Sequence, residues 1–228
     1  MKLRHKIIIS LIICFSSGLF ISFILNASSL TINNYENNSI YLEKYAKEIN
    51  GYWVNSRNYL HNSNKATGEQ IKNRIDPIKY YSHNRYKFAN ASFNEELLSP
   101  FELKIISFAI IWQESWFVNY SSQDNDTGFG FAALQWTTAE WLAEIYNWDW
   151  EEDKSKISPY GQVMSSRQGD KLQVKYMIGY LLWLYDYYDN NVGKTITGYN
   201  RGTRVNDKYY LEDYYLDVLG KIYNVLNY

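Results

Sequence analysis

Residues 170–188 constrain the fold of this chain more than any other segment. A helix drawn through them carries apolar side chains on almost every side, at Leu172, Val174, 176–178 and 181–184. A helix that is apolar all round has to be surrounded by other elements. The segment therefore predicts the buried central helix of a domain, and a chain of 228 residues is long enough to enclose it.

The other regular patterns are also helical. Asn94 can cap a helix whose apolar positions continue over residues 103–117, with Pro100 as a point where the helix divides in two. No alternating strand pattern of comparable length competes with these segments. The sequence predicts an all-α domain, with short β-ribbons in the loop 121–131. Further helices are expected over residues 138–146 and 211–226.

The N-terminus indicates export. Lys2, Arg4 and Lys6 precede an uncharged apolar run over residues 7–25, which fits either a signal peptide or a membrane anchor. The positive flank predicts that the rest of the chain enters the cell envelope, in the periplasm or at the cell surface, with the anchor in the inner membrane. We expect residues 1–26 to be this signal or anchor, 27–92 a polar spacer with some helix, and 93–228 the folded domain.

Composition narrows the classes of function. Three of the 23 basic residues lie in the first 26 positions, which hold no acid, so the remainder carries a net charge of −4. A broad basic face for nucleic acid is excluded on that balance. The three histidines, His5, His61 and His83, are far apart, so we expect no metal site and no cofactor. Aromatic residues make up 18% of the chain, and such rings can fill a core or line a groove for sugars.

Glu114 is the first candidate for chemistry. It lies four residues after Ile110, on the apolar face of its helix. A carboxyl group half-buried there would have a raised pKa and could hold a proton near neutral pH for donation to a leaving oxygen. Taken alone, Glu114 is more simply explained as a solvated residue at a helix end. The motifs around it therefore decide whether it is a candidate catalytic acid.

Four short motifs, the first of which contains Glu114, bear on this choice. Residues 112–117 are Trp-Gln-Glu-Ser-Trp-Phe, 132–135 are Ala-Ala-Leu-Gln, 179–184 are Gly-Tyr-Leu-Leu-Trp-Leu, and 196–202 are Ile-Thr-Gly-Tyr-Asn-Arg-Gly. In this order they resemble the soluble lytic transglycosylase family, with its Glu-Ser, Gly-Leu-Met-Gln and Ala-Tyr-Asn-Ala-Gly motifs. The resemblance covers about residues 93–205 and implies a lysozyme-like transglycosylase domain.

The resemblance also implies an activity. Such enzymes cleave the β-1,4 bond between N-acetylmuramic acid and N-acetylglucosamine in peptidoglycan, leaving a 1,6-anhydro-muramic end. Glu114 would be the single acid and base, and Ser115 beside it would help to order the site. Tyr199 would hydrogen-bond and orient Glu114, while Gln135 and Asn200 would hold sugar acetamido groups. The implied partners are peptidoglycan strands, the membrane through the N-terminal segment, and an envelope-spanning machine.

Two other functions stay open. Asp124 or Asp126 could activate a water, which would make the chain a hydrolytic muramidase resembling goose-type lysozyme, although Asp beside Gly is also ordinary turn chemistry. The chain could also be a wall-binding module that has lost activity.

Several residues depart from the family pattern. The second motif keeps only its Gln, and Arg201 stands where the family has a small residue.

Residues 147–168 look like an insertion. Trp148, Trp150 and Tyr160 within it would either pack on the domain, which we favour, or extend a wall for sugars. The tyrosines between 209 and 223 are interpreted as packing residues.

Overall fold

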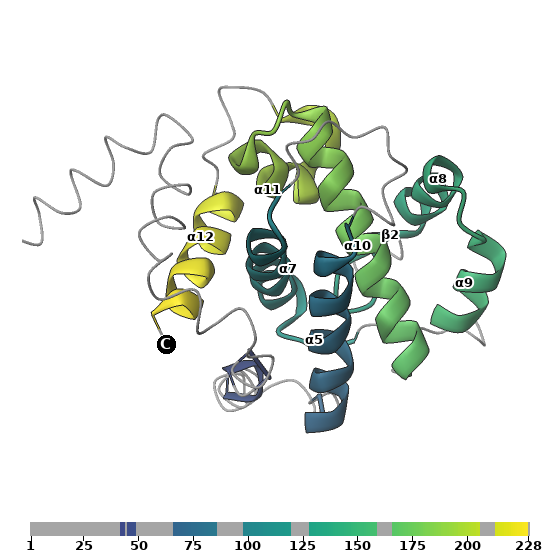
Figure 1. Cartoon of the computed structure of the whole chain (residues 1–228), viewed down its shortest axis with the longest axis horizontal. Helices are drawn as coiled ribbons and strands as arrows, with labels where there is room; N and C mark the ends of the chain where they lie inside the picture. The colour runs from purple at the N-terminus through teal and green to yellow at the C-terminus, as the bar shows by residue number, and fades with distance from the viewer. Residues whose placement is uncertain are drawn as a thin grey trace, which may run out of the picture.

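The computed structural model describes residues 42, 43, 45–48, 66–85, 98–119, 128–158, 166–205 and 213–227. Within these residues it is helical apart from one two-stranded ribbon, which confirms the all-α class (Figure 1). The ribbon pairs β1 (Gly128–Phe129) antiparallel with β2 (Leu134–Gln135). The helices are α5 (Gly68–His83), α7 (Pro100–Ser115), α8 (Trp136–Tyr146), α9 (Trp150–Ile157), α10 (Arg167–Tyr187), α11 (Val192–Arg201), the short 3-10 helix η3 (Gly202–Arg204) and α12 (Asp213–Leu226).

Helix α10 is the central helix that the sequence predicts. Ser166 caps it by accepting a hydrogen bond from the backbone N–H of Gly169, and most side chains from Asp170 to Leu184 are buried, with Lys171 exposed. Helices α5, α9 and α11 pack around it. The core therefore forms about α10, as expected for a helix that is mostly apolar.

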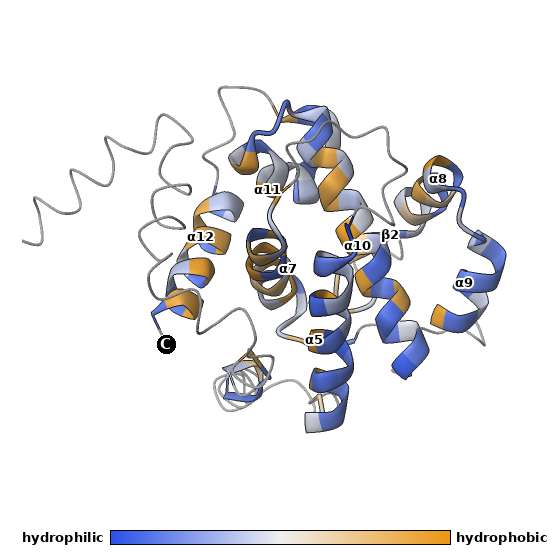
Figure 2. Cartoon of the chain, viewed as in Figure 1, coloured by the Kyte–Doolittle hydropathy of each residue, from blue (hydrophilic) through white to orange (hydrophobic). Residues whose placement is uncertain are grey.

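Helix α7 carries the candidate acid. Ser99 and Glu102 form a capping box at its start, and Pro100 occupies the first turn. Pro100 thus opens this helix and does not divide it, because a proline at the first position loses no helical hydrogen bond. Asn94, the predicted cap, lies outside the described residues. Nearly all of α7 is buried, and Figure 2 shows much of its ribbon in the hydrophobic colour.

Helix α5 lies within residues 27–92, for which the sequence predicts a polar spacer with some helix. Thr67 and Gln70 form its capping box, and Ile71, Ile75 and Ile78 are buried against α7 and α10. The boundary at residue 93 therefore separates α5 from the helices it packs on, and this part of the segment belongs to the helical body.

A second piece of the same segment also reaches the core. Residues 42, 43 and 45–48 are helical. The ring of Tyr45 stacks on Phe108 at a centroid distance of 6.1 Å and meets Trp112 edge-on at 5.6 Å. Both partners belong to α7, so this short helical piece packs against the helix that carries Glu114.

The predicted insertion, residues 147–168, contains α9. Trp148 and Trp150 both meet the ring of Tyr176 on α10, at centroid distances of 5.0 and 5.6 Å. These two tryptophans therefore pack on the domain, as we favoured, while Tyr160 lies outside the described residues. In the ranges that the structure describes, no helix is long and apolar enough to cross a membrane, and the apolar run 7–25 falls outside those ranges.

Candidate active site

Glu114 stands in the last turn of α7 and is half-buried. The hydroxyl of Tyr214, from the first turn of α12, donates a hydrogen bond to its Oε1 at 2.5 Å. Helix α12 packs along α7. Further along α12, the Lys221 amine donates a hydrogen bond to Gln113 Oε1 of α7 at 2.5 Å. The C-terminal helix therefore fixes the orientation of the Glu114 carboxylate.

Tyr214 is a residue that sequence reasoning missed. It belongs to the run of tyrosines between 209 and 223, which we interpreted as packing, and no motif marks it. Only the packing of α12 against α7 brings it to Glu114. The amphipathic pattern of residues 211–226 predicts that this helix packs on the rest of the domain. It does not predict which helix it packs against.

Tyr199 lies on α11 and is buried. Its hydroxyl donates to the backbone carbonyl of Ala132 at 2.7 Å, while Glu114 accepts a hydrogen bond from Tyr214. The contact between Tyr199 and Glu114 that the resemblance implies stays a prediction. The bond to Ala132 joins the Tyr-Asn motif to the Ala-Ala-Leu-Gln motif. The structure thus brings together motifs that lie more than sixty residues apart.

Both tyrosine hydroxyls stay protonated beside the acid. Burial raises the pKa of Tyr199 well above its usual range, and the charge of Glu114 raises it further. Burial likewise raises the pKa of Tyr214, with further contributions from the charge of Glu114 and the hydrogen bond to it. Glu114 therefore accepts a hydrogen bond from one neutral phenol, Tyr214, and has a second neutral phenol, Tyr199, within its electrostatic influence.

Three other predicted site residues occupy different environments. Ser115 is buried and its hydroxyl donates to the Ile111 carbonyl at 3.1 Å, so it fixes the last turn of α7. Gln135 ends β2 at the N-cap of α8, makes no capping hydrogen bond with its side chain, and is exposed. Asn200 is exposed on α11 next to Tyr199. Contact of Gln135 and Asn200 with sugar acetamido groups stays a prediction.

The turn that leaves α7 has a special backbone. Trp116 and Phe117 both have positive backbone φ angles, 54° and 63°, which residues other than glycine rarely adopt. The guanidinium of Arg74, on α5, donates to the Phe117 carbonyl from a position that is 1% exposed. Arg74 therefore holds the backbone that directly follows the Glu-Ser motif.

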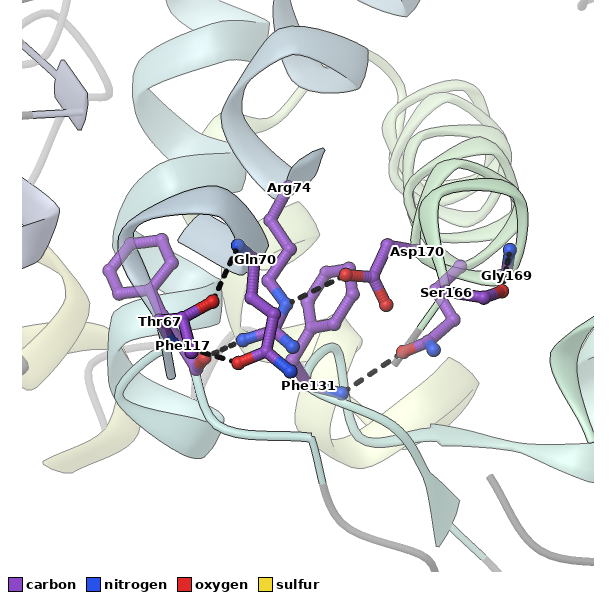
Figure 3. Close-up of polar contacts among 9 residues, drawn as sticks. Thr67, Gln70, Arg74, Phe117, Phe131, Ser166, Gly169 and Asp170 are labelled. Carbon is purple, nitrogen blue, oxygen red and sulfur yellow. Dashed lines mark hydrogen bonds and ion pairs between the residues drawn. The ribbon is translucent and has the colours of Figure 1, made fainter. Parts of the chain in front are cut away.

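Arg74 also links α10 to the loop of the second motif. Its Nε lies 3.2 Å from Asp170 Oδ2, and both side chains are 1% exposed. Its Cζ lies 5.0 Å from the ring centroid of Phe131. Figure 3 shows Arg74 between Asp170 and Phe117, with Phe131 beneath it. One buried cation therefore connects α5, the central helix α10, the turn after Glu114 and the loop of the second motif.

Gln173 makes a second link from α10, one helical turn beyond Asp170. Its Oε1 accepts a hydrogen bond from the backbone N–H of Phe131 at 3.0 Å. The neighbouring Gly130 has φ of +69°, and a Cβ there would lie 1.8 Å from the same Oε1. The sequence held a signal for Asp170 and Gln173, because both are polar residues in a helix that is otherwise buried.

The described part of the chain contains no group of three metal-ligating side chains, and Asp124 and Asp126 lie outside it. The arrangement at Glu114 is one half-buried carboxylate with a phenol donor, which suits proton transfer. No family model, curated protein or solved structure matches this chain.

Proposed function

We propose that this chain is a lytic transglycosylase that cleaves the bond between N-acetylmuramic acid and N-acetylglucosamine in peptidoglycan. The observation that carries the proposal is the setting of Glu114. Its carboxylate ends an apolar helix, is half-buried, and has its orientation fixed by the 2.5 Å bond from Tyr214. The Tyr199 bond to Ala132 supports it, because it joins two motifs of the resemblance.

In this mechanism Glu114 performs both proton transfers. It protonates the glycosidic oxygen as the bond from C1 breaks, which releases the N-acetylglucosamine side as an alcohol. The 6-hydroxyl of the muramic residue then bonds to C1 and gives its proton to the Glu114 carboxylate. The product is a 1,6-anhydro ring, and the acid is regenerated. No water attacks, so the paired carboxylates of ordinary glycosidases are not needed.

The remaining residues position the acid and the sugar. Tyr214 keeps one carboxylate oxygen of Glu114 in place, and Ser115 keeps the last helical turn rigid. The exposed amides of Gln135 and Asn200 contact the acetamido groups. A lysozyme-like arrangement of the helices, export to the cell envelope and work beside an envelope-spanning machine belong to the same proposal.

Digestion of peptidoglycan sacculi by the full-length chain in detergent tests this function. Borohydride reduces ordinary reducing ends and leaves anhydro ends unchanged, so mass spectrometry separates the two products. Anhydro-ended fragments support the proposal. Reducing ends identify a hydrolytic muramidase, and binding without soluble product identifies a wall-binding module.

Substitution at the acid completes the test. Glu114→Gln should abolish release, because the amide cannot donate and recover the proton. Glu144→Gln, at an exposed position of α8, is the matched control and should digest normally. Full activity of Glu114→Gln would remove Glu114 from the mechanism.

A further inference from the structure

An open groove runs between α5 and α10, along a side of the molecule that no sequence motif marks. Its larger part has a volume of about 640 Å³, and its walls include Tyr80, Tyr81, Arg167, Lys171 and Lys175. A smaller hollow of about 210 Å³ shares Tyr80, Arg167 and Lys171 with it and is also lined by Asn73, Asp76 and Pro77.

Three cations follow one face of α10 in this groove. Arg167, Lys171 and Lys175 are four residues apart, so they repeat at about 6 Å along the helix axis. Lys175 is paired with Asp153 at 2.8 Å. Arg167 and Lys171 are exposed, and neither makes an ion pair with any described residue. The first turn of α10 adds the positive end of its helix dipole beside Arg167.

The rest of the wall is amphipathic. Tyr80 is 50% exposed, and the Lys171 amine lies 5.2 Å from its ring centroid. Tyr81 and Leu172 complete an apolar floor. A simple inorganic anion would leave this floor unused, whereas a peptide with small apolar side chains and free carboxylates would cover it.

We infer that this groove binds the acidic peptide stems of peptidoglycan, an inference that rests on the proposed function. An extended peptide advances about 3.3 Å per residue, so carboxylates on alternate residues are spaced like the cations of α10. The carboxylates face Arg167 and Lys171, and the methyl groups of the stem lie on Tyr80 and Leu172. Residues 27–228 carry a net charge of −4, so a row of three cations on one helix face stands out against the overall balance.

Titration calorimetry tests the inference without any cleavage. The titrant is a synthetic, glycan-free stem tetrapeptide with free carboxylates, and the full-length Glu114→Gln chain in detergent is the receptor. We expect saturable binding that weakens as sodium chloride rises, because exposed charges are screened by salt. The fully amidated peptide should bind about tenfold more weakly. Failure of the acidic peptide to bind would overturn the inference.

Two variants localise the binding. Arg167→Gln combined with Lys171→Gln removes two exposed charges from the groove and should weaken binding about tenfold, with an unchanged circular dichroism spectrum. Lys154→Gln removes one exposed charge from α9, outside the groove, and should leave the affinity for the peptide unchanged. Unchanged binding by the double variant would place the site elsewhere.

Two further outcomes separate the possible explanations. Binding of poly(glycerol phosphate) in place of the peptide would show a phosphate site and overturn the assignment to peptide stems. A wild-type chain that fails to digest sacculi but binds the peptide would contradict the role of Glu114 and support the groove.

Discussion

Replacement of Gly130 by alanine tests how the central helix holds the second motif. Gly130 has φ of +69°, and a Cβ at this position would lie 1.8 Å from Gln173 Oε1 and 2.4 Å from its Cδ. Gln173 has little room to move aside, because it is 1% exposed. The alanine therefore displaces the carboxamide and breaks its hydrogen bond to the Phe131 N–H.

Two costs set the magnitude. A left-handed backbone at a residue with a Cβ costs about 1–2 kcal/mol. Loss of a buried hydrogen bond that leaves the Phe131 N–H unsatisfied costs about 1–3 kcal/mol. The free energy of unfolding should fall by about 2–5 kcal/mol, which lowers the melting temperature by roughly 4–20 °C in a chain of this size. Thermal unfolding followed by circular dichroism measures the shift.

The chain offers a matched control and a mutant cycle. A Cβ at Gly220, exposed in α12, meets no atom within 4 Å, so Gly220→Ala should stabilise by about 0.5–1 kcal/mol. In a Gln173→Ala background the clash is gone, and Gly130→Ala should then cost only its backbone share. Equal costs of Gly130→Ala with and without Gln173 would refute the role given to that side chain.

Two further predictions concern Tyr214 and Arg74. Tyr214→Phe removes a hydrogen bond to a charged group, worth about 1.5–3 kcal/mol, so kcat on sacculi should fall roughly tenfold or more; Tyr223→Phe, 59% exposed on the same helix, should not change it. Arg74→Met leaves the Asp170 carboxylate without its buried partner and should lower the free energy of unfolding by about 3–5 kcal/mol near neutral pH. Burial already raises the pKa of Asp170 to about 6 although Arg74 opposes this, and the unfolded value is 3.8. The folded variant therefore binds more protons than the unfolded chain, so its stability should increase as the pH falls from 7.5 to 5.5, measured by urea unfolding against the wild type.

The sequence predicts the helices whose apolar pattern is strong. The central segment 170–188 became α10, and 138–146 became α8, because burial of apolar faces decides these elements. Helix α5 was not predicted as a core element because its pattern is interrupted. Pro77 lies inside it and Arg74 occupies a buried position. These two residues break the apolar pattern that the isoleucines would otherwise form.

The candidate site was predicted only in its local parts. Motif order places Glu114 and Tyr199, since each motif is short and contiguous. Contacts between distant segments have no such local signal. The bond from Tyr214 and the two links made by Arg74 depend on how α12 and α5 dock, which is decided by packing across the whole domain.

The abundance of tyrosine has a structural explanation that bears on substrate recognition. Several buried or half-buried rings fill the core and also donate their hydroxyls to protein oxygens in other segments, so each joins two parts of the chain. These donors are Tyr146, Tyr176, Tyr188, Tyr199 and Tyr214. A hydroxyl that donates to protein has no proton left for a sugar. Hydrogen-bond donation to a glycan should therefore come from exposed amides such as Gln135 and Asn200, and replacement of a linking tyrosine by phenylalanine should weaken the fold or orient Glu114 poorly before it alters sugar affinity.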